Sequence, residues 1–473
     1  MPQIRKLLDK YNLDNYKYII SDAARAVITG LLIIPLYAGN LSLGDYGLVS
    51  YYKSLIELLI IMFSVGLPSV YVRQYFEFNE DNQTYTNSII NFIFLIFSLI
   101  GLAYIVILYL PLEISQSQNM KIITPIILFT AMLSVLESIV SVCLRAREMV
   151  NLFVIFNIVR AGLIFLLGFI FLKLNMEVLG VLISLLLAAL ISFPYLWYLV
   201  KSSYKLEINF SYLLNALKFS WPIFIGLLGI YFINKSGIIL IENSGSMDDL
   251  GRYALAQNFS LIVVLIAGAY SKYIQPIIFK SKKNKFDQLF SIHLIEFSYR
   301  LFATTILLVF FKLEILSMIV PDSFNEAGEY ITYLVLGSYI YSFVLMINMV
   351  LMYHKNSKGI LFSTLTGAVV TWITMYILMQ PFGVMGAVYG TIFGQLITVF
   401  IFLAISDSFI KINIVKYILL NISYTFIISF ISMFENINFQ IKVIIFLGII
   451  ICSKYFINYS KFAFNSNQTS VSA

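Results

Sequence analysis

Ten ionisable residues lie inside long apolar runs of this chain, and their types limit the chemistry that the sequence can support. The basic ones are Arg25, Lys53, Arg160, Lys235, Lys272 and Arg300, and the acidic ones are Asp22, Glu57, Glu137 and Glu296. A charge at the centre of a lipid-exposed helix costs on the order of 3 kcal/mol, so such groups usually face a protein interior or a water-filled cavity. Six cations minus four anions leaves an interior charge of about +2. A wet interior of that sign attracts anions and repels cations.

The spacing of these charges predicts which of them share a helix face. Residues three or four apart on a helix lie within reach of each other. An alternative interpretation is structural, because local ion pairs lower the cost of inserting a helix or lock neighbouring helices together. The predicted pairs are Asp22 with Arg25, Lys53 with Glu57, and Glu296 with Arg300.

The other four charges have no partner of opposite sign at helical spacing. They are Arg160, Lys235, Lys272 and the acid Glu137. Lys272 lies about two turns from one membrane face, where a lysine can extend its ammonium group to water. We therefore give Lys272 the least weight as a ligand-binding residue.

The elements that position these charges are membrane-spanning helices. Of the 473 residues, 60% are hydrophobic and 12% charged, against roughly 45–50% and 25% in soluble domains. Apolar runs of about 20 residues, long enough to cross a bilayer as a helix, recur along nearly the whole chain. We predict an all-α integral membrane protein of about fourteen spans, near residues 17–38, 47–71, 85–110, 121–144, 150–172, 177–200, 219–241, 253–279, 289–312, 330–352, 359–380, 383–405, 414–434 and 442–460.

The distribution of basic residues between loops predicts the orientation of these spans. Of the 31 Lys and Arg residues, six lie inside spans and five in loops on one side, which leaves 20 on the side of the N-terminus. Basic residues concentrate in cytoplasmic loops. We therefore expect both termini of this multi-pass protein to be cytoplasmic, and the protein to lie in the cytoplasmic (inner) membrane of the cell. The five basic residues on the external side are Lys121, Lys173, Arg252, Lys312 and Lys442.

An internal repeat indicates two halves of six helices each. The segment SLGDYG at 42–47 matches SMDDLG at 246–251, an offset of 204 residues, and each segment leads into a long apolar run. VLGV at 178–181 and VMGA at 384–387 match at nearly the same offset. Six helices is an even number, so the halves enter the membrane in the same sense and should be related by an axis along its normal. We predict an N-terminal lobe at 1–205, a C-terminal lobe at 206–408, and two additional helices with a cytoplasmic tail at 409–473.

The sequence does not favour an enzymatic function. No loop between spans exceeds about 20 residues, so a catalytic domain has no room, and no glycine-rich phosphate loop is present. Cys143 and Cys452 are far apart in sequence and support neither a disulfide framework nor a metal site. We expect no catalytic residues, no metal and no cofactor.

Three segments resemble the bacterial polysaccharide transporters, the O-antigen and capsule repeat-unit flippases of the multidrug/oligosaccharidyl-lipid/polysaccharide (MOP) exporter superfamily. They are LSLGDYGLVSYY at 41–52, SVGLPSVYVRQYFE at 64–77 and PFGVMGAVYGTIFGQ at 381–395. The resemblance implies two six-helix lobes that form a V around a central cavity with alternating access. It also implies a substrate made of an oligosaccharide repeat on an undecaprenyl pyrophosphate carrier, moved from the inner to the outer leaflet. The two additional C-terminal helices are frequent in that family.

The resemblance also implies that cations in the cavity meet the pyrophosphate. Arg25, Lys53, Lys235 and Arg300 occupy suitable helices, and Arg160 is a further candidate. Arginine suits a diphosphate because its planar fork binds two oxygens at once. At the repeat offset Lys235 falls opposite Leu31, so the cations of the two halves are not equivalent. The acids Asp22, Glu57, Glu137 and Glu296 would either orient these bases or couple transport to protons or sodium, and the sequence does not choose.

Three other functions compete with this prediction. A flippase for the peptidoglycan precursor (lipid II) would share the fold and the positive interior, whereas a cation-coupled multidrug exporter is disfavoured by that positive charge. A sugar-repeat polymerase needs a large external loop, and the longest external segment here, about 313–329, is too short. We expect the lipid bilayer and a lipid-linked oligosaccharide as partners, polysaccharide polymerase and glycosyltransferases as candidate protein partners, and no nucleic acid.

Overall fold

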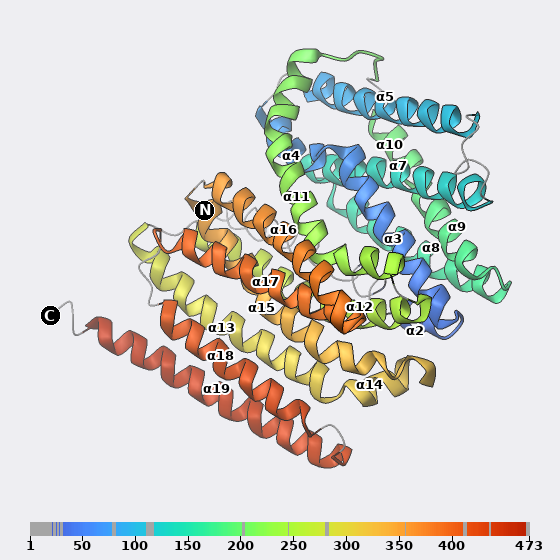
Figure 1. Cartoon of the computed structure of the whole chain (residues 1–473). Helices are drawn as coiled ribbons and strands as arrows, with labels where there is room; N and C mark the ends of the chain where they lie inside the picture. The colour runs from blue at the N-terminus through green and yellow to red at the C-terminus, as the bar shows by residue number, and fades with distance from the viewer. Residues whose placement is uncertain are drawn as a thin grey trace. The chain divides into compact units, whose positions relative to one another are not determined.

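The computed structural model describes residues 32–77, 82–109, 118–200, 204–244, 246–279, 283–354, 356–409, 414–434 and 437–469, together with Ser21, Arg25 and Ile28. These residues form helices joined by short turns and contain no β-strand (Figure 1). The chain divides into two compact units, Met1–Tyr231 and Phe232–Ala473. The two units join inside a single long helix, α11 (Phe210–Ser244), rather than at the boundary of 205 and 206 that the repeat predicts.

The first unit contains eight helices in its described part before α11. They are α2 (Ile33–Ala38), α3 (Leu43–Ser64), α4 (Leu67–Glu77), α5 (Asn82–Tyr109), α7 (Gln118–Ala146), α8 (Val150–Lys173), α9 (Glu177–Ala189) and α10 (Ser192–Val200). Helix α7 packs against α3, α4, α5, α8, α9 and α10, and it is the most buried candidate span of this unit. Glu137, near the middle of the C-terminal half of α7, is therefore surrounded by protein.

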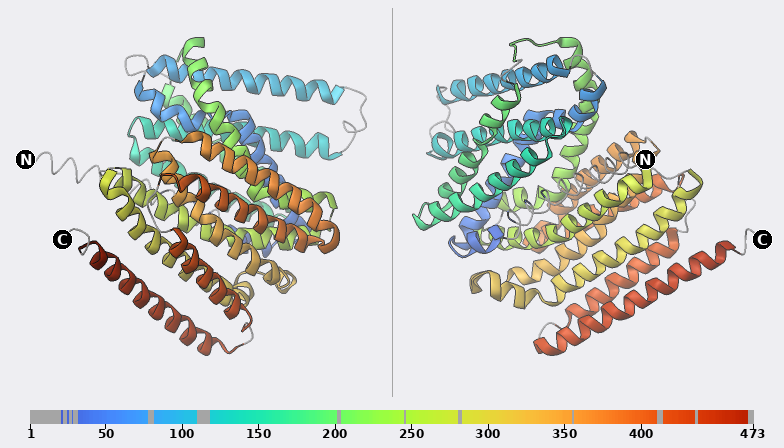
Figure 2. Two further views of the ribbon diagram at one scale, coloured as in Figure 1. Left: turned by 60° about the vertical axis from the view of Figure 1, so that its left-hand side comes forward. Right: turned by 180° about the vertical axis from the view of Figure 1, so that it is seen from behind.

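The second unit contains α12 (Met247–Phe279), α13 (Lys283–Phe310), α14 (Lys312–Ile319), the 3₁₀ turn η2 (Asp322–Phe324), α15 (Ala327–Tyr353), α16 (Ser357–Phe382), α17 (Val384–Ser406), α18 (Ile414–Ser432) and α19 (Phe439–Thr469). Helix α15 lies at the centre, against α12, α13 and α17. Helix α13 packs against both α18 and α19, and the three run side by side in both figures (Figure 2).

Eleven helices in the described part of the chain are long and apolar enough to cross a membrane. They match the predicted spans from 47–71 to 383–405, so the all-α membrane fold is confirmed. Most of the predicted first span lies outside the described residues. The predicted thirteenth and fourteenth spans are present as the helices α18 and α19, of which the described apolar part of α18, Leu420–Ser432, is shorter than a full span.

The predicted second span is not one continuous helix. It breaks between α3 and α4 at Val65 and Gly66, which have φ angles of 48° and 71°. A side chain at Gly66 would lie 3.0 Å from the carbonyl oxygen of Ser220. Only glycine adopts this left-handed backbone without steric cost while permitting so close an approach of another helix. The break therefore lets the SVGLPS segment pack directly against α11.

The start of each half shows the same local structure. The Ser42 hydroxyl accepts a hydrogen bond of 3.1 Å from the backbone N–H of Asp45, at the first residues of α3. The Ser246 hydroxyl accepts a 3.1 Å bond from the N–H of Asp249, at the first residues of α12. These are helix N-caps, each satisfying one of the unpaired N–H groups of a first turn. Equivalent caps at an offset of 204 residues support the predicted repeat.

The two C-terminal helices are bound to the second unit by buried polar contacts. The Lys442 ammonium, whose side chain is 1% exposed, lies 2.6 Å from Glu314 Oε1 and so ties α19 to α14. The Tyr339 hydroxyl donates a 2.6 Å hydrogen bond to Asn421 Oδ1 and ties α15 to α18. The rings of Phe302 and Tyr424 stack at 4.2 Å. Helices α18 and α19 are thus an integral part of this unit.

Candidate functional site

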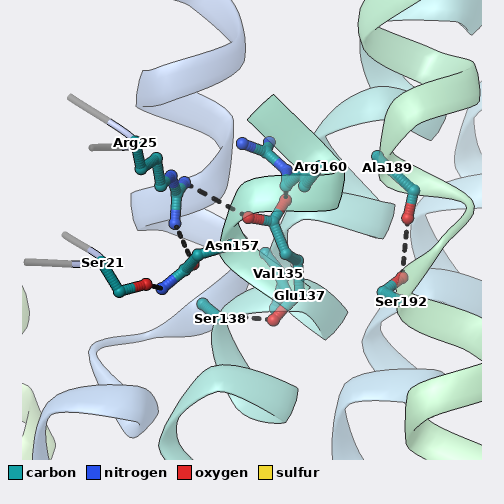
Figure 3. A network of polar contacts seen from close by, with 9 residues as sticks. All are labelled: Ser21, Arg25, Val135, Glu137, Ser138, Asn157, Arg160, Ala189 and Ser192. Atoms are coloured by element: carbon teal, nitrogen blue, oxygen red, sulfur yellow. Dashed lines mark hydrogen bonds and ion pairs between the residues drawn. The ribbon is translucent and has the colours of Figure 1, made fainter. Parts of the chain in front are cut away.

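A carboxylate bound by two guanidinium groups forms the most buried charge cluster of the first unit (Figure 3). Glu137 Oε1 accepts a 3.2 Å hydrogen bond from Arg25 Nη2. Glu137 Oε2 forms an ion pair with Nε of Arg160. The side chain of Glu137 is 5% exposed, that of Arg160 12% and that of Arg25 34%. Glu137 and Arg160 are therefore nearly desolvated, whereas Arg25 keeps one open side.

An amide and a hydroxyl extend this cluster. Asn157, which is fully buried, accepts a 3.2 Å hydrogen bond from Arg25 Nη1 through Oδ1. Its Nδ2 donates a 3.2 Å bond to the Ser21 hydroxyl. Asn157 and Arg160 are three residues apart on α8 and share one face. Together Ser21, Asn157 and Glu137 fix the position of the Arg25 side chain, as Figure 3 shows.

Helix geometry places the cluster near the middle of the bilayer. Glu137 lies nine residues before the end of α7 at Ala146, and Arg160 lies ten residues after the start of α8 at Val150. At 1.5 Å per residue these positions are about 14 and 15 Å from the helix ends. The hydrocarbon core is about 30 Å thick. The Arg25 guanidinium reaches the level of these two side chains.

Arg160 and Glu137 have no opposite charge at helical spacing, as predicted, but the structure pairs them with each other. Their partners come from neighbouring helices and not from helical spacing along one helix. The predicted pairing of Arg25 with Asp22 cannot be compared, because Asp22 lies outside the described residues. Among the described residues, the cluster joins two guanidinium groups to one carboxylate. The exposed side of Arg25 presents the kind of forked N–H donor that binds anions.

The second unit holds a smaller charge cluster on α12 and α13. The predicted ion pair is confirmed, with Arg300 Nη2 3.4 Å from Glu296 Oε1. Glu296 Oε2 accepts a 3.2 Å hydrogen bond from the Tyr270 hydroxyl and lies 3.8 Å from His293 Nδ1. The Arg300 guanidinium lies over the Tyr270 ring at 5.2 Å from its centre. The side chain of Arg300 is 55% exposed, so its guanidinium is less enclosed by protein than that of Arg25.

The other predicted site residues lie elsewhere on the helices. The Lys53 ammonium on α3 lies 5.9 Å from the centre of the Tyr37 ring, and its predicted pairing with the exposed Glu57 stays a prediction. Lys235 is half-buried on α11, in the part of that helix that belongs to the second unit. Lys272 is exposed on α12.

Sequence reasoning missed Ser21 and Asn157. A usable signal was present for Asn157, because an amide one helical turn from an intramembrane arginine marks a polar face on that helix. The partner helix α7 carries no such signal beyond Glu137 itself, since its other neighbours in sequence are apolar or small. Cys143 on α7 is buried, Cys452 on α19 is exposed, and both are free thiols.

The fold belongs to a known class of membrane proteins. The structure superposes on the lipid II flippase MurJ with a TM-score of 0.70, at 16% sequence identity, covering 95% of this chain and 99% of that chain. An inward-facing multidrug resistance MATE family transporter of the MOP superfamily gives a TM-score of 0.63 at 13% identity, covering 81% and 94% of the two chains. The chain therefore shares its fold with these two proteins.

Sequence comparison assigns the family. Residues 16–282 match the model of the polysaccharide biosynthesis protein family. This chain belongs to that family. A curated relative is the Lsg locus putative protein 1 of Haemophilus influenzae, which is 22% identical over 282 residues, 58% of this chain and 67% of the relative. The matched region contains Arg25, Glu137, Asn157 and Arg160.

Proposed function

We propose that this protein is a flippase that carries an oligosaccharide repeat unit, linked to undecaprenyl pyrophosphate, from the inner to the outer leaflet of the cytoplasmic membrane. The product would serve the synthesis of O-antigen, capsule or exopolysaccharide. The observation that carries this proposal is the cluster of Arg25, Glu137 and Arg160, because it places two guanidinium groups near the middle of the membrane. The family match and the fold support it.

In this proposal Arg25 is the first group that the pyrophosphate meets. Its side chain is the most exposed of the three, and its forked donors match the two phosphates. A phosphate oxygen that binds Arg25 competes with Glu137 for the same N–H groups. Arg160 holds Glu137 in place while Arg25 changes partner, because the pair of Arg160 and Glu137 is buried. Arg300, Lys53 and Lys235 remain proposed contacts for the anionic substrate.

Glu137 is also the proposed point at which transport couples to an ion. A proton or a sodium ion that neutralises Glu137 would release its hold on Arg25. The acids Glu57, Glu296 and Asp22 are alternative coupling groups. Polysaccharide polymerase and glycosyltransferases are the proposed protein partners, and both termini are proposed to lie in the cytoplasm.

A second candidate is a flippase for lipid II, which is favoured by the superposition on MurJ. Lipid II also carries a pyrophosphate, so the arginine cluster fits both substrates. The family match to polysaccharide biosynthesis proteins favours the oligosaccharide carrier. A multidrug exporter is disfavoured, because a cationic drug would meet the guanidinium groups of Arg25 and Arg160.

The test is restoration of surface polysaccharide in a strain that lacks the gene. We expect Arg25→Ala, inserted at normal levels, to reduce surface polysaccharide at least ten-fold and to leave lipid-linked glycan on the inner leaflet. The matched control is Arg73→Ala, which removes an exposed arginine from an ion pair with Glu77 and should restore the glycan fully. Full restoration by Arg25→Ala would overturn the proposed role of the cluster. Growth rescue of a strain depleted of its lipid II flippase would favour the second candidate instead.

A further inference from the structure

A cavity in the second unit has no place in the mechanism proposed above. It has a volume of about 780 Å³, within the range of roughly 300–1,000 Å³ typical of small-molecule sites. The beginning of α14, the first turns of α15, Met385 near the start of α17 and the last residues of α18 enclose it. Its lining residues are Lys312, Leu313, Asn325, Glu326, Gly328, Glu329, Thr332, Tyr333, Leu336, Met385, Ser429, Ser432 and Met433.

The lining of this cavity carries one ammonium and two carboxylates, those of Lys312, Glu326 and Glu329. The Lys312 ammonium is buried and donates a 2.7 Å hydrogen bond to the Thr332 hydroxyl. The Glu326 carboxylate lies 2.9 Å from Nη2 of Arg252 outside the cavity, and Nη1 of Arg252 lies 3.0 Å from Asp249 Oδ1. The lining therefore has no excess of positive charge and offers no electrostatic advantage to a phosphate.

The lining groups instead suit a neutral ligand with many hydroxyl groups. Carboxylate, amide and hydroxyl oxygens accept hydrogen bonds, and the ammonium, amide and hydroxyl groups donate them. The cavity offers both kinds from several directions, through Asn325, Glu329 and the hydroxyls of Ser429 and Ser432. The Tyr333 ring, 39% exposed, adds an apolar surface beside Met385. A sugar ring combines the same two properties, hydroxyls at its rim and apolar C–H groups on its face.

The position of the cavity agrees with a saccharide ligand. The residues that line it lie next to the loops that the charge distribution assigns to the external side, those after α13, before α17 and after α18. One wall comes from α18, which lies outside the twelve-helix repeat and is tied to α15 by the bond between Tyr339 and Asn421. A second buried pair, Lys442 with Glu314, holds α14 in place.

We propose that this cavity binds neutral sugar residues on the external side of the membrane, separately from the cationic site of the first unit. The inference rests on the proposed function, because the sugar would be that of the delivered glycan. It gives α18 a specific role as one wall of this sugar-binding cavity. The ligand is a saccharide, and either a lipid-linked repeat unit or a free glycan could supply it.

The experiment measures sugar binding to the full chain in lipid nanodiscs. The probes are glucose, galactose, N-acetylglucosamine and lactose, each at millimolar concentration, with saturation-transfer NMR as the readout. We expect transfer to at least one of them, lost in Ser429→Trp because the indole fills the cavity. We expect about ten-fold weaker binding in Glu329→Gln, because a hydrogen bond to a carboxylate is replaced by a weaker neutral one.

Matched controls separate the cavity from other surfaces. Ser423→Trp places the same side chain on an exposed part of α18 away from the cavity, and Glu207→Gln makes the same change at an exposed site of the first unit. Both should bind sugar normally. Arg25→Ala should also bind sugar while failing to restore surface polysaccharide, which distinguishes this inference from the proposed function.

Three results would overturn the inference. The first is no saturation transfer to any of the four sugars. The second is transfer that Ser429→Trp leaves unchanged, which would place the sugar elsewhere. The third is binding of inorganic pyrophosphate, Mg²⁺ or phosphoethanolamine that Ser429→Trp abolishes while sugar binding is absent. A soluble sugar that binds would then be compared with vesicles that carry a lipid-linked sugar, to assign the source.

Discussion

Replacing Glu137 with leucine tests whether the charge cluster of the first unit is a buried ion pair. The variant leaves Arg160 without its carboxylate in a site where its side chain is 12% exposed. Removing one partner of a buried ion pair costs about 3–5 kcal/mol, because the remaining charge stays desolvated. The exposed pair of Arg73 and Glu77, with side chains 72% and 45% exposed, should contribute at most about 1 kcal/mol. Breaking the buried pair should therefore lower the free energy of unfolding several times more than breaking the exposed pair.

The assay is thermal unfolding of the purified chain in nanodiscs, with Glu77→Leu as the matched control. We expect Glu137→Leu to lower the midpoint several times more than Glu77→Leu. The double variant Glu137→Leu with Arg160→Met should recover much of the loss, because no charge is then left buried without a partner. Equal midpoints for the two single variants would refute the buried pair. A double variant no more stable than Glu137→Leu would show that the loss has another cause.

Two further predictions concern the parts of the fold that position the sites. Replacing Ser42 with alanine removes the N-cap of α3, and replacing Ser246 removes the equivalent N-cap of α12. Each change should lower the free energy of unfolding by about 1 kcal/mol. Unequal losses, with one near zero, would contradict the equivalence of the two caps. Lys442→Met should destabilise the second unit by about 2 kcal/mol and expose α19 to protease, because Glu314 loses a charged hydrogen-bond donor. The control is Lys454→Met, near the middle of α19, and unchanged protease resistance of Lys442→Met would show that this pair does not hold α19.

Hydropathy and charge distribution predicted the spans well, because lipid imposes a length and a composition on each helix. The breaks in α3–α4 and α9–α10 were missed. Gly66 gave a local signal for the first break, but its cause is the approach of α11 from more than 150 residues away. Hydropathy averages over such a break, because the residues on both sides are equally apolar. Only the packing of the two helices fixes where the chain must turn.

The sequence likewise predicted some features of the charge cluster and not others. Arg25, Glu137 and Arg160 stand out in the sequence as costly charges in apolar runs, and each was selected as a site residue for that reason. Spacing along one helix detected the pair of Glu296 and Arg300 but could not detect a pair between α7 and α8. Asn157 was not predicted as a site residue because a neutral amide in a membrane helix is a weaker sequence signal than a charge. The contacts between two helices depend on how each helix is rotated about its own axis. When a helix is apolar on every side, the periodicity of its apolar residues does not determine this rotation.

The burial of the three charges would allow the cluster to bind the proposed anion without losing stability. Arg160 and Glu137 are the two most buried members and neutralise each other, so this pair alone satisfies the low-dielectric interior. Arg25 is the most exposed member of the cluster. An anion that draws Arg25 away from Glu137 therefore leaves no unpaired charge behind it. A cluster with the reverse order of burial would have to unpair a desolvated arginine for every anion bound, at a cost of several kcal/mol.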